Sequence, residues 1–311
     1  MSDTTLRTPE EVAKVLKISR FTVYELIKRG ELPSYRIGRS MRIEAADLEK
    51  YIQQAKQGDF SAQPLPPAPI EKTTAPLSGL ILCGQDVILD VLASHLETQL
   101  HSNRVLRRYI GSIGGLIALY NEAVNIATAH LWDGDSDEYN IPYVRRYLPG
   151  RKALVINLVY RMEGFYVAPG NPKGITDWAD LTRPDVRFVN REPGAGARVL
   201  LDEKLRQLDI DSNQISGYNR KEMSHLAVAS CVARGDADVG IGTEKAAMQV
   251  QQVEFIPLQK ERYDFIMLRQ DIDKPEFRTL MSILRSNDFR REVDGMGGYD
   301  TSRMGEIVAE V

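Results

Sequence analysis

Residues 186–208 read VRFVNREPGAGARVLLDEKLRQL: a strand-like apolar run, a turn of small residues and an amphipathic helical segment. The same order recurs at 79–100, where GLILCG precedes a helical pattern, and at 104–120, where RVLRRYIG precedes SIGGLIALY. Strands that alternate with helices are typical of an α/β fold with mostly parallel sheets. Residues 79–311 are therefore predicted to form an α/β body.

Small residues occupy the turn in each of these units, at 83–86, 111–115 and 191–196. Backbone N–H groups at a helix start, together with the helix dipole, attract anions, and glycine lets a ligand approach the backbone. Three such turns in one α/β body predict a small-ligand cleft at the carboxyl ends of the strands.

The composition of the 311 residues is that of a globular cytoplasmic protein of about two domains. Apolar residues make up 43% of the chain, which is enough to form a core. The two cysteines give no disulfide framework and are expected to be reduced. The first residues lack the pattern of a signal peptide, and no apolar run is long enough to cross a membrane.

Proline is dense, and apolar periodicity is absent, between the body and the N-terminal residues. This composition predicts a flexible linker over 56–78 that joins a head, residues 1–55, to the body, residues 79–311. Charge differs between these parts. Residues 20–42 hold six basic and two acidic residues in a chain whose net charge is −3, which is the pattern expected of a nucleic-acid contact surface.

The head has the sequence signals of a winged helix-turn-helix. Thr8-Pro9-Glu10-Glu11 is a capping box with proline at the first helical position, and a second helix is predicted between Ser19 and Gly30. Two short helices joined by a tight turn match a helix-turn-helix, in which the second helix contacts the bases. Residues 35–43 then predict a hairpin wing with Arg39 at its tip, followed by a third amphipathic helix.

Over residues 5–53 the chain resembles the excisionase/MerR-like winged helix-turn-helix family, in S-R-x-T-V-Y at 19–24, R-G-E-L-P at 29–33 and R-I-G-R-x-x-R-I at 36–43. The resemblance implies that the partner is double-stranded DNA. The implied contacts to bases or backbone are Arg20, Thr22 and Tyr24, those to phosphates are Arg36, Arg39 and Arg42, and Lys28 is a further candidate. Because one small recognition helix reads few base pairs, we expect a homodimer or a higher even oligomer.

The body resembles the type 2 periplasmic-binding-protein-like domain of molybdate- and tungstate-binding proteins, in GSIGGLIAL at 111–119, VRFVNREPGAGARVLLDE at 186–203 and HLAVASCVARGDADVGIG at 225–242. The resemblance implies two lobes, 79–163 with 266–311 and 165–260, joined by crossover strands near 164–168 and 258–265. It implies a ligand between the lobes, in contact with Gln85, Ser112, Gly114, His130, Arg191, Gly194, Gly196 and Tyr263.

Several alternatives remain open for these residues. Tyr263 is as compatible with a place in the core, His130 with a structural role, and Arg191 and Arg198 with ion pairs to Glu192 or Glu203. Asp86 is expected to cap a helix and to point away from an anion.

Alternatives also remain for the function. An enzyme is disfavoured, because the four histidines lack metal-ligand spacing and no nucleotide-binding or nucleophile motif appears, so no cofactor, metal or catalytic residue is predicted. Cys83 is a possible nucleophile, but no base to activate it is identifiable. An architectural DNA-binding factor would need only the head. The sequence thus predicts a regulator that senses a small ligand, an oxyanion such as molybdate or tungstate first, or else a small organic acid or cofactor-related metabolite.

Overall fold

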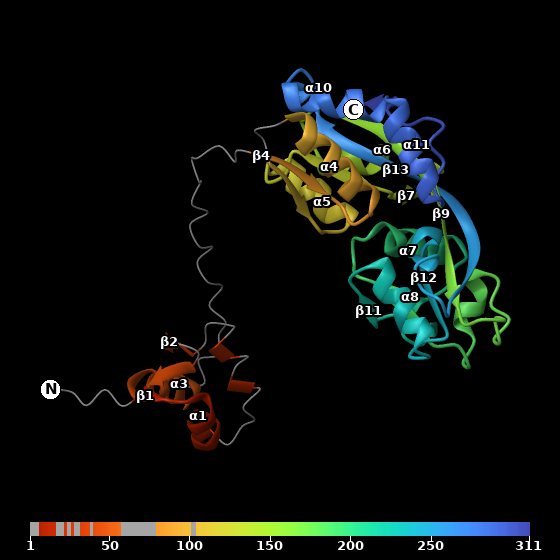
Figure 1. The fold of residues 1–311 in the computed structure, drawn as a ribbon. Coiled ribbons are helices and arrows are strands. Elements are labelled where there is room, and N and C mark those ends of the chain that lie inside the picture. The colour runs from red at the N-terminus through yellow and green to blue at the C-terminus, as the bar shows by residue number, and fades with distance from the viewer. Residues whose placement is uncertain are drawn as a thin grey trace. The chain divides into compact units, whose positions relative to one another are not determined.

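The computed structural model describes residues 6–16, 22–23, 26–27, 32–37, 40–56, 79–100 and 104–311. The chain divides into two compact units, Met1–Pro76 and Leu77–Val311 (Figure 1). The expected linker beyond Lys56 lies outside the described residues, and so do four of the proposed DNA contacts, Arg20, Tyr24, Lys28 and Arg39.

The N-terminal unit contains β1 (Leu6–Arg7), α1 (Pro9–Leu16), β2 (Tyr35–Ile37), β3 (Ser40–Glu44) and α3 (Ala45–Lys56), with its strands in the order β1-β3-β2. The predicted capping box is confirmed, because Thr8 N donates to Glu11 Oε2 at 2.8 Å and Glu11 N donates to Thr8 Oγ1 at 3.3 Å. The predicted hairpin is confirmed by the antiparallel pairing of β2 with β3. A small apolar core that includes Val12, Leu32 and Ile43 holds these elements together.

The first lobe of the larger unit is built on parallel strands. β4 (Gly79–Cys83) pairs in parallel with β5 (Arg104–Arg108) and with β6 (Ile126–Ala129). Its other elements are α4 (Ile88–Leu100), α5 (Ser112–Tyr120), β7 (Trp132–Asp133), β8 (Glu138–Tyr139), α6 (Ile141–Tyr147), α10 (Pro275–Leu284), α11 (Asn287–Met296) and β14 (Ile307–Glu310).

The second lobe repeats the parallel pattern. β10 (Phe188–Arg191) pairs in parallel with β11 (Lys221–Glu222) and with β12 (Val239–Thr243). The helices of this lobe are α7 (Gly196–Gln207), α8 (His225–Ala233) and the short α9 (Glu244–Ala247), and 3-10 turns lie at Trp178–Thr182 (η1), Ser212–Gln214 (η2) and, in the first lobe, Arg269–Asp271 (η3). The two-lobed α/β fold predicted from the sequence is confirmed.

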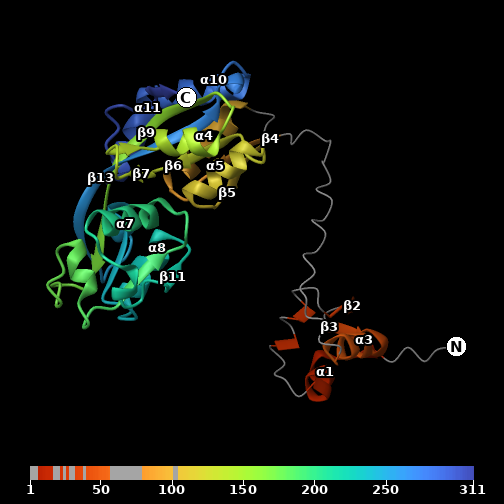
Figure 2. The same ribbon diagram turned by 180° about the vertical axis from the view of Figure 1, so that it is seen from behind.

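Two long antiparallel strands join the lobes. β9 (Ala153–Val167) pairs with β13 (Glu254–Leu268) along nearly its whole length, and both run from one lobe into the other (Figures 1 and 2). Residues 163–167 of β9 already pair with β12 of the second lobe. The first crossover therefore lies before Glu163, and the expectation that placed it near 164–168 was wrong by a few residues.

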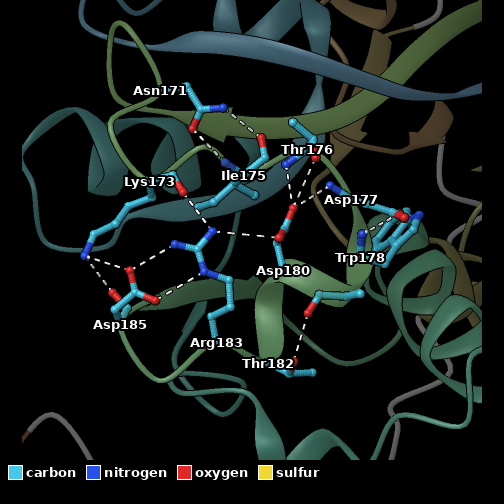
Figure 3. Close-up of polar contacts among 11 residues, drawn as sticks. Asn171, Lys173, Ile175, Thr176, Asp177, Trp178, Asp180, Thr182, Arg183 and Asp185 are labelled. Carbon is cyan, nitrogen blue, oxygen red and sulfur yellow. Dashed lines mark hydrogen bonds and ion pairs between the residues drawn. The ribbon is translucent and has the colours of Figure 1, made fainter.

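The segment between β9 and β10 is held by its own polar contacts (Figure 3). Asp177 and Asp180 form a capping box at η1, and Arg183 pairs with Asp185, to which Lys173 also donates. None of these residues lines the pocket described below. Among the described residues, no helix is long and apolar enough to cross a membrane.

Candidate ligand-binding cleft

The three small-residue turns predicted from the sequence meet at one small pocket. The first two turns belong to the first lobe and the third to the second lobe. The lining residues from the turns are Gly84, Gln85 and Asp86 of the first, Gly111 and Ser112 of the second, and Arg191, Ala195 and Gly196 of the third. The remaining lining residues are Ile110, Thr128, His130, Arg161, His225 and Tyr263.

Two of the helices that begin at this pocket have no side-chain cap. Gly111 is the N-cap of α5 and Ala195 is the N-cap of α7, and neither helix start receives a side-chain hydrogen bond. The first N–H groups of a helix lack partners within the helix, and an anion is one group that can satisfy them. Each lobe therefore contributes a helix start without a side-chain cap to the pocket.

The lobes contact each other beside the pocket. Ile113 N, at the start of α5, donates to the carbonyl oxygen of Gly194 at 3.0 Å. A Cβ added at Gly111 would lie only 3.1 Å from Ala195 Cα. The structure thus represents a state in which the cleft is closed at this edge.

Arg191 connects the two lobes through charge-assisted hydrogen bonds. Its side chain is 2% exposed. Its Nε donates to Glu192 Oε2 at 2.8 Å, and its Nη2 donates to Gln85 Oε1 in the first lobe at 2.7 Å. The ion pair with Glu192 that the sequence left open is present, yet Arg191 also lines the pocket. Arg198 instead pairs with Asp202 and does not line it.

Arg161 is a buried residue of the pocket that sequence reasoning missed. Its guanidinium pairs with Asp86 and with Glu261, and it lies over the ring of Tyr263 at 4.1 Å. The available signal was an arginine inside the apolar run of β9, since arginine is rarely buried without a partner. Those partners come from distant parts of the chain.

Asp86 caps α4, as predicted, because its Oδ1 accepts from Ile88 N at 2.9 Å. Asp86 is also among the residues that line the pocket. Its carboxylate is occupied by Arg161 and by the Tyr299 hydroxyl, which donates to Oδ1 at 2.5 Å. Asp86 therefore balances the charge of Arg161.

Two histidines, His130 and His225, line the pocket. His130 Nδ1 lies 2.7 Å from Glu261 Oε2, and His225 Nδ1 is buried without a hydrogen-bond partner among the described residues. Burial lowers the pKa of both, and lowers that of His225 well below its usual range. His225 lies on α8 and was not predicted as a site residue.

The predicted ligand contacts fall into three groups. Six line the pocket: Gln85, Ser112, His130, Arg191, Gly196 and Tyr263. Tyr263 also donates to Thr128 Oγ1 at 2.8 Å and is part of the core, and its contact with a ligand stays a prediction. Gly194 supplies the carbonyl of the lobe contact, whereas Gly114 is not among the lining residues.

The proposed DNA contacts can be followed only in part. Arg36 lies on β2 and Arg42 on β3, so both belong to the two strands of the hairpin wing. Arg42 Nη1 donates to the carbonyl of Met41 at 2.9 Å. Thr22 is described, with a half-buried side chain. The roles of these residues on DNA stay predictions.

A second, more apolar pocket adjoins the first at the mouth of the cleft. It shares Gln85, Asp86 and His225 with the first pocket. Its apolar lining includes four exposed side chains, two from the first lobe and two from the second: Val87, Tyr109, Met223 and Leu226. Exposed apolar side chains on both sides of a cleft form a surface that an organic ligand could cover.

Comparison with known proteins supports both parts of the architecture. A helix-turn-helix domain matches residues 8–56, and a PBP superfamily domain matches residues 93–285. The uncharacterized protein YvgK of Bacillus subtilis is 40% identical over 311 residues, and the alignment covers all of both chains. Both family resemblances expected from the sequence are confirmed.

Solved structures show the same fold at low sequence identity. The sulfate-binding protein SubI of Mycobacterium tuberculosis has a TM-score of 0.53 and 14% identity, covering 71% of this chain and 86% of its own. The effector-binding domain of a BenM variant has a TM-score of 0.51 and 11% identity, covering 71% of this chain and 98% of its own.

Proposed function

Since the chain belongs to the PBP superfamily and carries an N-terminal helix-turn-helix domain, we propose that it is a transcriptional regulator whose DNA affinity responds to a small oxyanion, molybdate or tungstate first, bound between its lobes. The helix-turn-helix domain would bind the operator, and the two-lobed body would sense the effector. The protein would act in the cytoplasm as a homodimer or a higher even oligomer.

One observation carries the proposal: the turns before α4, α5 and α7, which come from both lobes, line a single small pocket. Two of these helix starts have no side-chain cap. A dehydrated tetrahedral anion presents oxygens in several directions, and backbone N–H groups from opposite sides can satisfy them together. The fold is also one on which SubI is named as binding sulfate, an analogy of fold rather than of site.

Arg191 would supply the charged contact. Its Nη2, which now donates to Gln85 Oε1 at 2.7 Å, is oriented toward the first lobe. An anion that took over this hydrogen bond would bridge Arg191 and the first lobe, and charge-assisted bonds of this kind are the stronger ones. Binding would then favour the closed lobes. Coupling between an effector site and a DNA site is typically about 1–3 kcal/mol.

Catalysis is no part of the proposal. The two matched domains are of DNA-binding and ligand-binding types. Burial raises the pKa of the Cys83 thiol to about 11, so this thiol is protonated at neutral pH and is a poor nucleophile.

Calorimetry of the full-length protein with molybdate, tungstate, sulfate and phosphate tests the effector. We expect at least one of them to bind with a Kd below about 100 μM, and we expect Ser112→Ala and Arg191→Ala to weaken it about tenfold or more, which is about 1.4 kcal/mol. Arg198→Ala is the matched control, because Arg198 pairs with Asp202 outside the pocket. If none of the four anions binds in this range, the oxyanion assignment fails.

The apolar pocket at the mouth of the cleft favours a second candidate, a small organic acid. Its carboxylate would occupy the helix starts, and its apolar part would cover Met223 and Leu226. Met223→Ser with Leu226→Ser would then weaken binding of an organic acid and leave an inorganic oxyanion unaffected. Equal effects on both ligands would count against this distinction.

A further inference from the structure

Three possible metal ligands from distant parts of the chain meet between the lobes. His130 follows β6, Glu163 lies on β9 and Glu261 lies on β13. One ligand atom from each lies within 4.8 Å of the other two, and all three residues are buried. Spacing along the sequence predicted no metal site, because 33 and 98 positions separate these residues and only the fold brings them together.

Glu163 differs from the other two residues of this group in its lack of hydrogen-bond partners. Its side chain is 0% exposed, and neither carboxylate oxygen has a hydrogen-bond partner among the described residues. Leaving a buried polar group unpaired costs free energy, and for an ionised carboxylate the cost is much larger. Something must therefore neutralise it, and a proton and a cation are the two possibilities.

The charges around Glu163 are compatible with a divalent cation. Among the described residues, the guanidinium groups buried beside the pocket are those of Arg161 and Arg191. Arg161 pairs with Asp86 and Glu261, and Arg191 pairs with Glu192. Glu163 is a fourth carboxylate. When a cation takes the place of its proton, the ionised carboxylates outnumber these two guanidinium groups by two, and an ion of charge +2 would balance the cluster.

We propose that His130, Glu163 and Glu261 bind a divalent transition-metal cation of the Zn²⁺ type, with water completing the coordination. One imidazole nitrogen and two carboxylate oxygens are ligands that Zn²⁺ accepts at about 2.0–2.2 Å, so small side-chain shifts would bring all three to one ion. Arg161 Nε donates to Oε1 of Glu261, whereas His130 contacts Oε2, so Arg161 would orient that carboxylate.

The proposed site would bear on both lobes. Glu163 and Glu261 lie on the two strands that join the lobes, and His130 also lines the ligand pocket. A Cβ added at Gly196 of the second lobe would lie 2.5 Å from the His130 ring, so this ring packs directly against the opposite lobe. A cation at these atoms would add positive charge beside the cleft and fix His130 in place.

Metal binding by the full-length protein, after removal of metal with a chelator and without added oxyanion, tests the proposal. We expect about one equivalent of Zn²⁺ by calorimetry, and with Co²⁺ the visible absorption of a four- or five-coordinate site. Glu163→Gln and His130→Gln should each weaken Zn²⁺ binding at least tenfold. Glu292→Gln is the matched control, because Glu292 forms an exposed pair with His95 at 2.7 Å and should leave binding unchanged.

Three results would overturn the proposal: no stoichiometric binding of Zn²⁺ or Co²⁺ by the wild type, unchanged binding in both Glu163→Gln and His130→Gln, or loss of binding in Glu292→Gln. If a proton occupies the site instead, Glu163→Gln will match or exceed the wild type in thermal stability, and no metal equivalent will appear. Because the titration uses the metal alone, its outcome does not depend on the effector.

Discussion

Adding one methyl group at Gly111 should oppose closure of the lobes without disturbing either lobe. Gly111 precedes α5 and has φ −68° and ψ 169°, a conformation that alanine adopts without strain. The added Cβ would lie 3.1 Å from Ala195 Cα and 3.2 Å from both Ala195 N and the Gly194 carbonyl oxygen. Those atoms are backbone of the opposite lobe. The clash can therefore be relieved by separating the lobes.

The expected loss of effector affinity in Gly111→Ala follows from the contact distances of the added Cβ. Contacts of 3.1–3.2 Å require a shift of a few tenths of an ångström, and the Ile113 N to Gly194 O hydrogen bond lies beside them. Overpacking of this kind costs about 1–3 kcal/mol. If the whole cost falls on the closed state, Gly111→Ala lowers effector affinity by about 5- to 150-fold.

Distances between spin labels measure closure directly. Ile117 in the first lobe and Leu208 in the second are exposed, and both native cysteines are buried, so labels at Ile117→Cys and Leu208→Cys should react selectively. We expect Gly111→Ala to shift the pulsed electron-resonance distance distribution to longer values, and saturating effector to shorten it again. Gly295→Ala is the control, because a Cβ there meets nothing within 4 Å.

Unchanged distances and unchanged effector affinity in Gly111→Ala would refute this reasoning. The same holds if Gly295→Ala has an equal effect, since the change would then not depend on the lobe contact.

Three further predictions concern the head, the assembly and the hinge region. The double variant Arg39→Ala, Arg42→Ala should weaken binding to all DNA sequences alike. Fluorescence anisotropy should also show that the slope of log affinity against log salt concentration falls by about two units. An unchanged slope would mean that neither residue contacts phosphate. Light scattering should find a homodimer or higher even oligomer, and a monomer both free and on DNA would rule this out. Lys260, which donates to Asp300 at 2.6 Å, and next the hydrogen bonds from Ser302 lower the pKa of Asp300 to about 2. The stability that this lowered pKa contributes is present above the unfolded pKa of about 4 and is lost as pH falls toward 2. Urea unfolding should therefore show that the difference in free energy of unfolding between wild type and Asp300→Asn narrows from pH 6 to pH 3. A difference that stays constant over this range would contradict the prediction.

The sequence predicted those parts of the fold whose signals are local. At 186–208, the apolar strand, the glycine-rich turn and the amphipathic helix correspond to β10 and α7. The capping box at Thr8 and the hairpin at 35–43 are equally local, and both formed. β9 continues through Arg161 and Glu163, which a local apolar pattern does not predict. Arg161 pairs with Asp86 and Glu261, and Glu163 lies near His130 and Glu261. These neighbours come from distant parts of the chain, so a single sequence does not reveal them.

The same distinction between local signals and long-range contacts holds for the residues of the cleft. Four of the six predicted contacts that line the pocket lie in the small-residue turns: Gln85, Ser112, Arg191 and Gly196. The other two, His130 and Tyr263, were implied only by the family resemblance. Arg161 was missed because its partners Asp86 and Glu261 lie 75 and 100 positions away. His225 was missed because it occupies the first position of an ordinary apolar helix, and only the packing of α8 places it at the pocket.

A regulator that senses an oxyanion must bind its operator with an affinity that depends on that oxyanion. An operator selected from random DNA would be titrated with the full-length protein at fixed salt, with and without saturating molybdate or tungstate. We expect the effector to change operator affinity by about 5- to 150-fold and Arg191→Ala to abolish this change. Operator affinity that is the same with and without an effector that calorimetry shows to be bound would contradict it.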